Sequence, residues 1–280
     1  MSRNLAVLGS PISHSKSPVI HSAAYSVLGK DFEYNKIHVE KNHLMQFVET
    51  LDESWLGLSI TAPLKTEALR LAKSADETAT LTGSANTLLR GELGWKAFNT
   101  DVFGIQKALV DLDPKFIETV SIIGSGATAV SAVLAVSKSF PNVRLLLASR
   151  NKSTLNDLIR FANQVGIKKV RTVTTRKALT KADLILSTLP AGALDTEAKS
   201  LEKSRFAKPK GFFFDVAYDP WPSRTAQLWI ANNLQTVSGV EMLLWQAVAQ
   251  IRIFCEGDPS IELFNEAAVI LAMRHSIGLI

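Results

Sequence analysis

Ile122-Ile123-Gly124-Ser125-Gly126-Ala127-Thr128-Ala129 is the stretch that decides the fold of this 280-residue chain, because it matches the pattern G-x-G-x-x-G/A. The apolar run Val120–Ile123 predicts a strand before it, and the Ala- and Val-rich run Val130–Ser137 predicts a helix after it. Such glycines let the backbone approach a pyrophosphate, to which the helix N-terminus offers N–H groups. We therefore expect a dinucleotide site, with a purely structural turn as the alternative. Its candidate residues are Gly124, Ser125, Gly126, Ala127, Thr128 and Ala129.

The alternation of strand and helix continues beyond this turn. A helix is predicted at Thr154–Gln164, and further strands are predicted at Val143–Ala148, Val170–Val173, Leu184–Leu186, Phe212–Val216 and Leu234–Val237. This order is typical of a doubly wound, Rossmann-type parallel sheet. Two helical stretches, at about 240–254 and 261–280, follow it.

The turn after the predicted strand Val143–Ala148 carries basic residues where a site for NAD would carry an acidic one. No Asp or Glu occurs between Arg144 and Leu155, and the turn contains Ser149, Arg150 and Lys152 instead. An arginine can bind a phosphate through two hydrogen bonds. The sequence therefore predicts NADP as cofactor, with a solvated basic turn as the alternative.

The first hundred residues predict a separate α/β domain. Its strands are expected at 5–8, 33–39, 57–61, 86–89 and 95–98, and its helices are expected from the capping Ser17 to Leu28, from near Leu64, and from Asp101 toward Pro114. We expect residues 1–103 to form a substrate-binding and catalytic domain and residues 104–255 to form the dinucleotide-binding domain. The last helix, about 256–280, is expected to pack back on the first domain.

The composition is that of an ordinary globular enzyme. The chain is 46% hydrophobic and 20% charged, with a net charge of +5 spread along its length. The sequence contains no basic stripe with interleaved aromatic residues, the pattern that would suggest nucleic-acid binding. No apolar run is long enough to span a membrane. The single cysteine, Cys255, excludes an internal disulfide, and no histidines have metal-ligand spacing. We expect a cytoplasmic protein without a metal.

Four polar clusters follow or precede strands of the first domain. They are Gly9–Pro18, Ser59–Lys65, Ser84–Thr87 and Phe98–Asp101. Singly, each is unremarkable, since a lone lysine is usually a solvated surface charge and a lone aspartate is often a helix cap. Together they form a set suited to binding a hydroxylated acid.

The chemistry of this set resides in four side chains. The hydroxyls of Ser15 and Ser17 could bind a carboxylate, although both residues could simply cap a helix. A dehydrogenase must deliver a proton to the ketone oxygen as hydride reaches the carbon. Lys65 can supply that proton, and Asp101 can orient Lys65 and bind a substrate hydroxyl.

Eight motifs in order make the chain similar to the shikimate dehydrogenase family over essentially its whole length. They lie at residues 10–18, 59–65, 84–88, 98–104, 124–129, 187–192, 215–220 and 239–247. The resemblance implies reversible NADPH-dependent reduction of 3-dehydroshikimate to shikimate, in aromatic amino acid biosynthesis, by a monomer or homodimer whose partners are small molecules.

The resemblance also assigns roles to individual residues. Lys65 and Asp101 are implied to be the catalytic pair. The substrate is implied to contact Ser15, Ser17, Thr61, Asn86, Tyr218 and Gln246. Thr188, Gly239 and Met242 are implied to lie near the nicotinamide, and Arg150 near the adenosine phosphate.

Three departures from the family pattern bear on binding. The family usually has asparagine at the position of Ser59 and a third glycine at the position of Ala127. The cofactor turn keeps its arginine but changes both neighbours, and Thr154 stands where a second arginine is often found. These changes bear on affinity and cofactor choice and leave the reaction class intact.

Three alternatives stay open from the sequence. A quinate dehydrogenase of the same family is the nearest, although the presence of both Ser15 and Ser17 favours shikimate. A non-catalytic ligand-binding relative is disfavoured because Lys65 and Asp101 are both present. A nucleic-acid-binding protein is the most remote.

Overall fold

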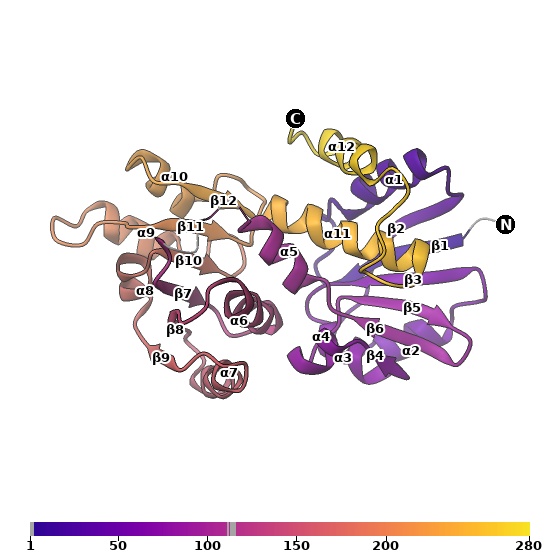
Figure 1. Ribbon diagram of the computed structural model, residues 1–280, viewed down its shortest axis with the longest axis horizontal. Helices are drawn as coiled ribbons and strands as arrows, with labels where there is room; N and C mark the ends of the chain where they lie inside the picture. Colours follow the sequence, from indigo (N-terminus) through magenta and orange to yellow (C-terminus); the bar gives the residue numbers. More distant parts are fainter. Residues whose placement is uncertain (1–2, 111, 113–115) are drawn as a thin grey trace. The chain divides into compact units, whose positions relative to one another are not determined.

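The structure is a computed structural model that describes residues 3–110, 112 and 116–280 (Figure 1). The chain folds into two compact units, a first unit of Met1–Gly104 with Leu243–Ile280 and a second unit of Ile105–Met242. The sequence placed residues 243–255 with the dinucleotide-binding domain, whereas the structure groups them with the first unit. The reason is packing: Leu244, Val248 and Ile251 join Leu5 and Val7 in one buried cluster.

The first unit is built on a mixed six-stranded sheet. Its strands are β1 (Arg3–Gly9), β2 (Phe32–His38), β3 (Trp55–Ile60), β4 (Ser74–Ala75), β5 (Thr87–Gly91) and β6 (Gly94–Phe98), in the order β2-β1-β3-β5-β6-β4. β1 pairs in parallel with β2 and β3, whereas β5 runs antiparallel to both β3 and β6. The carboxyl ends of β1, β3 and β6 therefore lie at the same edge of the sheet as the start of β5.

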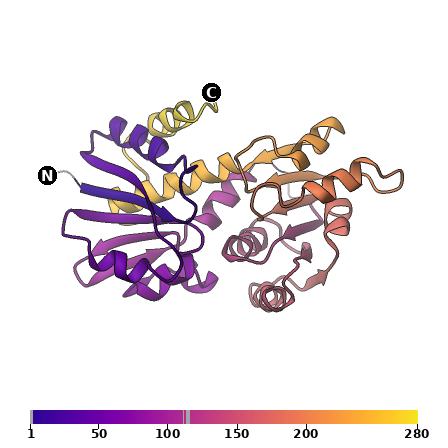
Figure 2. The same ribbon diagram turned by 180° about the vertical axis from the view of Figure 1, so that it is seen from behind.

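Helices pack around this sheet. They are α1 (Ser17–Leu28), α2 (Leu44–Glu49), α3 (Lys65–Leu71), α4 (Glu77–Thr82) and α12 (Glu266–Ser276), joined by the start of α5 (Asp101–Ala108) and most of α11 (Gly239–Glu256). α1 ends at Leu28, as the sequence predicts, and Gly29 follows it in the left-handed conformation. α12 packs against α1 (Figure 2). The predicted end of the third helix, at Pro114, lies outside the described residues.

The second unit has a six-stranded, wholly parallel sheet. Its strands are β7 (Thr119–Ile123), β8 (Arg144–Ala148), β9 (Lys169–Thr172), β10 (Leu184–Ser187), β11 (Phe212–Asp215) and β12 (Thr236–Ser238), in the order β12-β11-β10-β7-β8-β9. The order reverses between β7 and β10, which is the arrangement of a dinucleotide-binding sheet. The predicted α/β class with a doubly wound second domain is confirmed.

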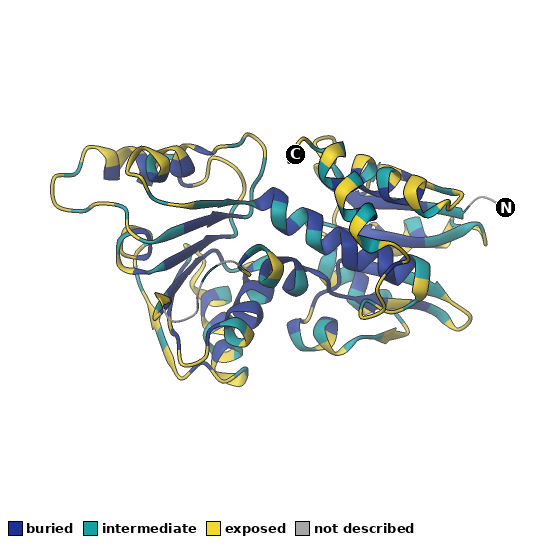
Figure 3. Ribbon diagram, turned by 45° about the horizontal axis from the view of Figure 1, so that its top comes forward, coloured by how far each residue is buried: buried dark blue, intermediate teal, exposed yellow. Residues whose placement is uncertain are grey.

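The helices of the second unit form two groups. α6 (Ala127–Ser139) and α7 (Lys152–Gln164) pack on each other, whereas α8 (Thr175–Lys181), α9 (Asp195–Glu202) and α10 (Arg224–Ala231) share one buried cluster around Phe213 and Trp229. In Figure 3 the inner strands of both sheets are mostly buried, whereas the edge strands and the outer helix faces are more exposed. Within the described residues, no helix is both long and apolar enough to cross a membrane.

Candidate active site and cofactor site

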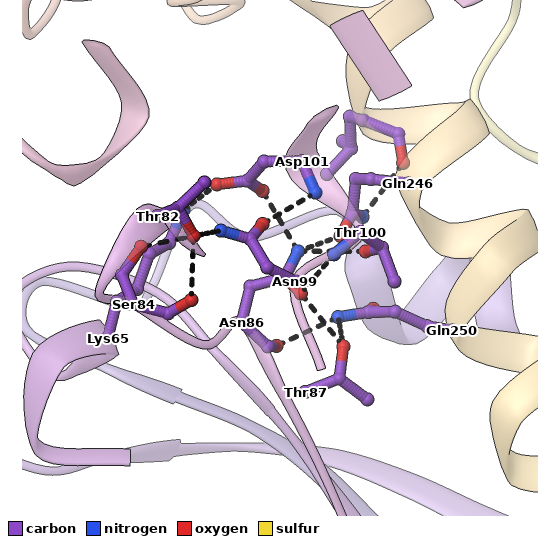
Figure 4. Close-up of polar contacts among 11 residues, drawn as sticks. Lys65, Thr82, Ser84, Asn86, Thr87, Asn99, Thr100, Asp101, Gln246 and Gln250 are labelled. Carbon is purple, nitrogen blue, oxygen red and sulfur yellow. Dashed lines mark hydrogen bonds and ion pairs between the residues drawn. The ribbon is translucent and has the colours of Figure 1, made fainter. Parts of the chain in front are cut away.

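Lys65 and Asp101 form an ion pair in the first unit. Lys65 begins α3, shortly after β3, and Asp101 begins α5, shortly after β6. The two strands end at the same edge of the sheet, and Nζ of Lys65 lies 2.5 Å from Oδ2 of Asp101 (Figure 4). The side chains are only 12% and 5% exposed. Lys65 is therefore not a solvated surface charge, and the pair can hold a proton donor in a fixed place.

Asn86 ties this pair to its surroundings. Its Nδ2 donates to Oδ1 of Asp101 at 2.9 Å and to the hydroxyl of Thr100 at 2.8 Å. Its Oδ1 accepts from the backbone N–H of Thr100 and from the hydroxyl of Thr87. Asn86 is buried, so these bonds replace those it would make to water. The amide therefore orients the carboxylate of Asp101.

Gln246 approaches from α11, and its Oε1 accepts from Nδ2 of Asn86 at 3.3 Å. On the other side, Oδ1 of Asn99 accepts from the backbone N–H of Asp101, and Nδ2 of Asn99 donates to the hydroxyls of Thr82 and Ser84. Asn99 thus links the start of α5 to Thr82 at the end of α4 and to Ser84 in the segment between α4 and β5.

Ser15, Ser17 and Thr61 follow β1 and β3, which end at the same edge of the sheet. The expectation that Ser17 caps α1 was wrong: Lys16 takes the N-cap position without a side-chain cap, and Ser17 is the first helical residue. The hydroxyl of Ser15 accepts from the backbone N–H of Ser17 at 3.3 Å. Both hydroxyls therefore lie at the start of α1. Tyr218, also predicted to contact substrate, belongs to the second unit, where it follows β11.

The glycine-rich turn in the second unit is built for close approach. Gly124 follows β7 with φ of 123°, and a Cβ there would overlap the hydroxyl of Thr188. Gly126 precedes α6, no side chain caps that helix, and a Cβ at Gly126 would meet nothing within 4 Å. Ala127, Thr128 and Ala129 form the first turn of α6. An uncapped helix start beside open space fits a pyrophosphate.

A cluster of three hydroxyls joins this turn to the basic turn after β8. Ser125 Oγ lies 2.8 Å from Oγ of Ser149 and 2.6 Å from Oγ1 of Thr154. Arg150 and Lys152 are exposed beside this cluster in the chain. Two cations and a group of hydroxyls fit the ribose phosphate that distinguishes NADP from NAD.

The residues predicted to lie near the nicotinamide follow other strands of the same sheet. Thr188 comes after β10, and its hydroxyl donates to the carbonyl oxygen of Ile123 at 3.1 Å. Gly239 begins α11 directly after β12, and a Cβ there would overlap the carbonyl oxygen of Val216. Met242 lies one turn further and is buried. Parallel strands bring Thr188, Gly239 and the glycine-rich turn to one edge of the sheet.

Sequence reasoning assigned no role to several residues that the structure ties to the site. Thr87 and Thr100 lie inside the predicted polar clusters, and both form hydrogen bonds with Asn86. Thr154 adds a hydroxyl to the cofactor turn, and Gln250, which bonds Thr87, was not singled out at all. Gln250 left a signal, because it is a polar residue one helical turn after Gln246 in an otherwise apolar stretch. Within the ranges described, no group of three or more His, Cys, Asp or Glu residues could hold a metal ion.

Comparisons with known proteins point to one family. The family model for the shikimate dehydrogenase substrate binding domain matches residues 7–88. The shikimate dehydrogenase (NADP(+)) of Synechocystis sp. is 31% identical, across 94% of this chain and 93% of its own.

Two solved structures extend the likeness. Shikimate dehydrogenase of Mycobacterium tuberculosis is 32% identical with a TM-score of 0.83, covering 98% of this chain and 99% of that one. The shikimate 5-dehydrogenase of Mycobacterium fortuitum is 35% identical with a TM-score of 0.77, covering 97% and 98%. The fold, the paired lysine and aspartate, and these full-length relatives together show that the chain belongs to the shikimate dehydrogenase family.

Proposed function

We propose that this protein is a shikimate dehydrogenase that reduces 3-dehydroshikimate to shikimate, reversibly, with NADPH. The observation that carries the proposal is the buried pair of Lys65 and Asp101, oriented by Asn86. The relative from Synechocystis sp., which is 31% identical, is named shikimate dehydrogenase (NADP(+)), and this name supports both the activity and the cofactor.

The pair handles the proton of the reaction. Bound NADPH supplies the hydride that reaches the carbonyl carbon. Lys65 donates a proton from Nζ to the ketone oxygen as charge develops there, and takes it back in the reverse direction. Asp101 holds the ammonium group in place. The low exposure of both side chains keeps water from competing for the proton.

The substrate is bound by groups at the edge of the first sheet. We assign the carboxylate to the hydroxyls of Ser15 and Ser17, and the ring hydroxyls to Thr61, Asn86 and Gln246, with Tyr218 as a further contact. Asn86 and Gln246 offer both amide donors and acceptors, as hydroxyl groups require.

The second unit is assigned to the cofactor. Residues 124–129 would hold the pyrophosphate, Arg150 and Lys152 with Ser149 the ribose phosphate, and Thr188, Gly239 and Met242 the nicotinamide. We further propose that the enzyme acts in the cytoplasm as a monomer or homodimer, with small molecules as its partners and with no membrane or nucleic acid.

The direct test is a spectrophotometric assay of shikimate and quinate with NADP and NAD, in all four combinations. We expect shikimate with NADP to give the highest kcat/KM. Quinate carries one more hydroxyl, which would be left unpaired or in collision beside Ser15 and Ser17, and an unpaired buried polar group costs about 1–3 kcal/mol. Equal or better turnover of quinate would refute the assignment of substrate.

A further inference from the structure

Gln250, on α11, uses every hydrogen-bonding group of its side chain within the first unit. Nε2 donates to the backbone carbonyl of Asn86 at 3.0 Å and to the hydroxyl of Thr87 at 2.9 Å. Oε1 accepts from the hydroxyl of Ser59 at 2.9 Å. The residue is 1% exposed, and the bonds reach residues more than 160 positions away in the chain.

The two strands that Gln250 joins are neighbours at the active-site edge of the sheet. Ser59 and Thr87 stand opposite each other in the antiparallel pair β3 and β5. Their hydroxyls bind the two ends of one amide. Burying an amide costs free energy unless it is hydrogen-bonded, so packing alone would be served better by an apolar side chain at this buried position. The bonds of Gln250 therefore specify geometry at Ser59 and Thr87 beyond simple packing.

Thr87 connects Gln250 to the side chain of Asn86 through its hydroxyl group. Its hydroxyl accepts from Gln250 and has one hydrogen left, which it donates to Oδ1 of Asn86 at 2.9 Å. Because Oδ1 is held in this way, the opposite end of the amide, Nδ2, faces Oδ1 of Asp101. Were the amide turned over, its oxygen would face the carboxylate and repel it.

We propose that Gln250 is a positioning residue for the reaction: through Thr87 it fixes the orientation of the Asn86 amide, and so holds Asp101 where it pairs with Lys65. The chain of contacts runs Gln250–Thr87–Asn86–Asp101–Lys65, and each link is a hydrogen bond of 2.5 to 2.9 Å. This role rests on the proposed function, because it concerns the same catalytic pair.

The test is Gln250→Met, which keeps the length of the side chain and removes its hydrogen bonds. Misplacing a catalytic group by about 1 Å can cost on the order of 100-fold. We expect kcat for shikimate oxidation to fall about 10- to 100-fold and KM for shikimate to rise, whereas KM for NADP stays unchanged. A purely structural role would lower the fraction of folded enzyme and leave both KM values as they are.

The matched control is Glu266→Gln. Glu266 accepts two hydrogen bonds from Arg252, which is on the same helix as Gln250, at 2.7 and 2.5 Å. This variant should lower the melting temperature without changing kcat or either KM. Comparing Glu266→Gln with Gln250→Met therefore distinguishes the effect of lower stability around α11 from the effect of a misplaced Asp101 carboxylate.

A second variant, Thr87→Val, removes the hydroxyl that relays the effect. If Gln250 acts through Thr87, the double variant should be little worse than the more damaging single variant. If Gln250→Met fails to fold, Thr87→Val alone can test the proposal. It is the smaller change, because it exchanges one hydroxyl group for a methyl group.

The outcomes distinguish this role from the proposed function. A wild-type enzyme that does not oxidise shikimate with NADP would overturn both. An active wild type with unchanged kcat and KM in Gln250→Met would overturn only the positioning role, as would fully additive effects of the two substitutions. Unchanged kinetics in Thr87→Val would overturn the relay in the same way.

Discussion

Nζ of Lys65 lies 2.5 Å from Oδ2 of Asp101, and the second carboxylate oxygen of Asp101, Oδ1, accepts from Nδ2 of Asn86 at 2.9 Å. The carboxylate is thus held at both oxygens. Breaking a buried ion pair by removing one partner is costly, because the remaining charge is left without its counterpart. Lys65 and Asp101 should therefore behave as a unit.

Lys65→Ala is expected to lower kcat by about 10²- to 10⁴-fold, the usual contribution of a positioned acid or base. Asp101→Ala should also be severe, and the double variant should lose less than the product of the two single losses. Steady-state kinetics at saturating shikimate measures this, with circular dichroism to verify the fold. Near-normal kcat in Lys65→Ala would show that the proton comes from another group.

Arg150→Ala tests the cofactor turn. A charge-assisted hydrogen bond to a phosphate is worth about 1.5–3 kcal/mol, so KM for NADP should rise about 10- to 100-fold and KM for NAD should change little. Arg205, an exposed arginine elsewhere in the second unit, provides the control Arg205→Ala, in which both constants should stay as they are. An unchanged ratio in Arg150→Ala would place the phosphate elsewhere.

Two glycines of the second unit should respond in opposite ways to substitution by alanine. A Cβ on Gly126 meets nothing within 4 Å, and φ there is −85°, so Gly126→Ala should fold normally but bind NADP more weakly. A Cβ on Gly239 would overlap the carbonyl oxygen of Val216, so Gly239→Ala should lose about 1–3 kcal/mol of stability. Thermal unfolding and NADP titration separate the two effects, and equal stability of both variants would contradict the expectation.

His21 makes stability depend on pH. Burial lowers its pKa from 6.5 to about 3. The unfolded chain therefore binds one proton more than the folded protein between these values, and stability falls as pH drops below 6.5. By pH 5 this amounts to about 2 kcal/mol, at 1.4 kcal/mol for each unit.

Replacing the ring removes this dependence. His21→Phe should lose less stability than the wild type between pH 6.5 and pH 5, as measured by urea unfolding. The exposed His43 gives the control His43→Gln, whose loss should match that of the wild type. Parallel curves for wild type and His21→Phe would show that His21 is protonated in the folded protein as readily as in the unfolded chain.

Several elements could be predicted from local sequence. The end of α1 at Leu28 is one of them, because a glycine follows it: Gly29 has φ of 61°, the left-handed conformation in which helices commonly end. α8, α9 and α10 were missed, since helices of seven or eight residues gain most of their stability from packing rather than from their own sequence. The two-residue strand β4 likewise has no pattern long enough to recognise.

The sequence by itself determined the parallel sheet with its glycine-rich turn, because alternating apolar runs and two glycines act over a few residues, and it also marked Lys65, Asn86 and Asp101. Only the tertiary structure decided that these three side chains meet. Their meeting depends on β5 lying antiparallel between β3 and β6. The β5–β6 pair is a local hairpin, but no local pattern encodes the pairing of β5 with the distant strand β3. Gln250 shows the same limit most sharply: its partners Asn86 and Thr87 lie 164 and 163 residues away, and hydrogen bonds over such separations exist only once α11 packs on the sheet.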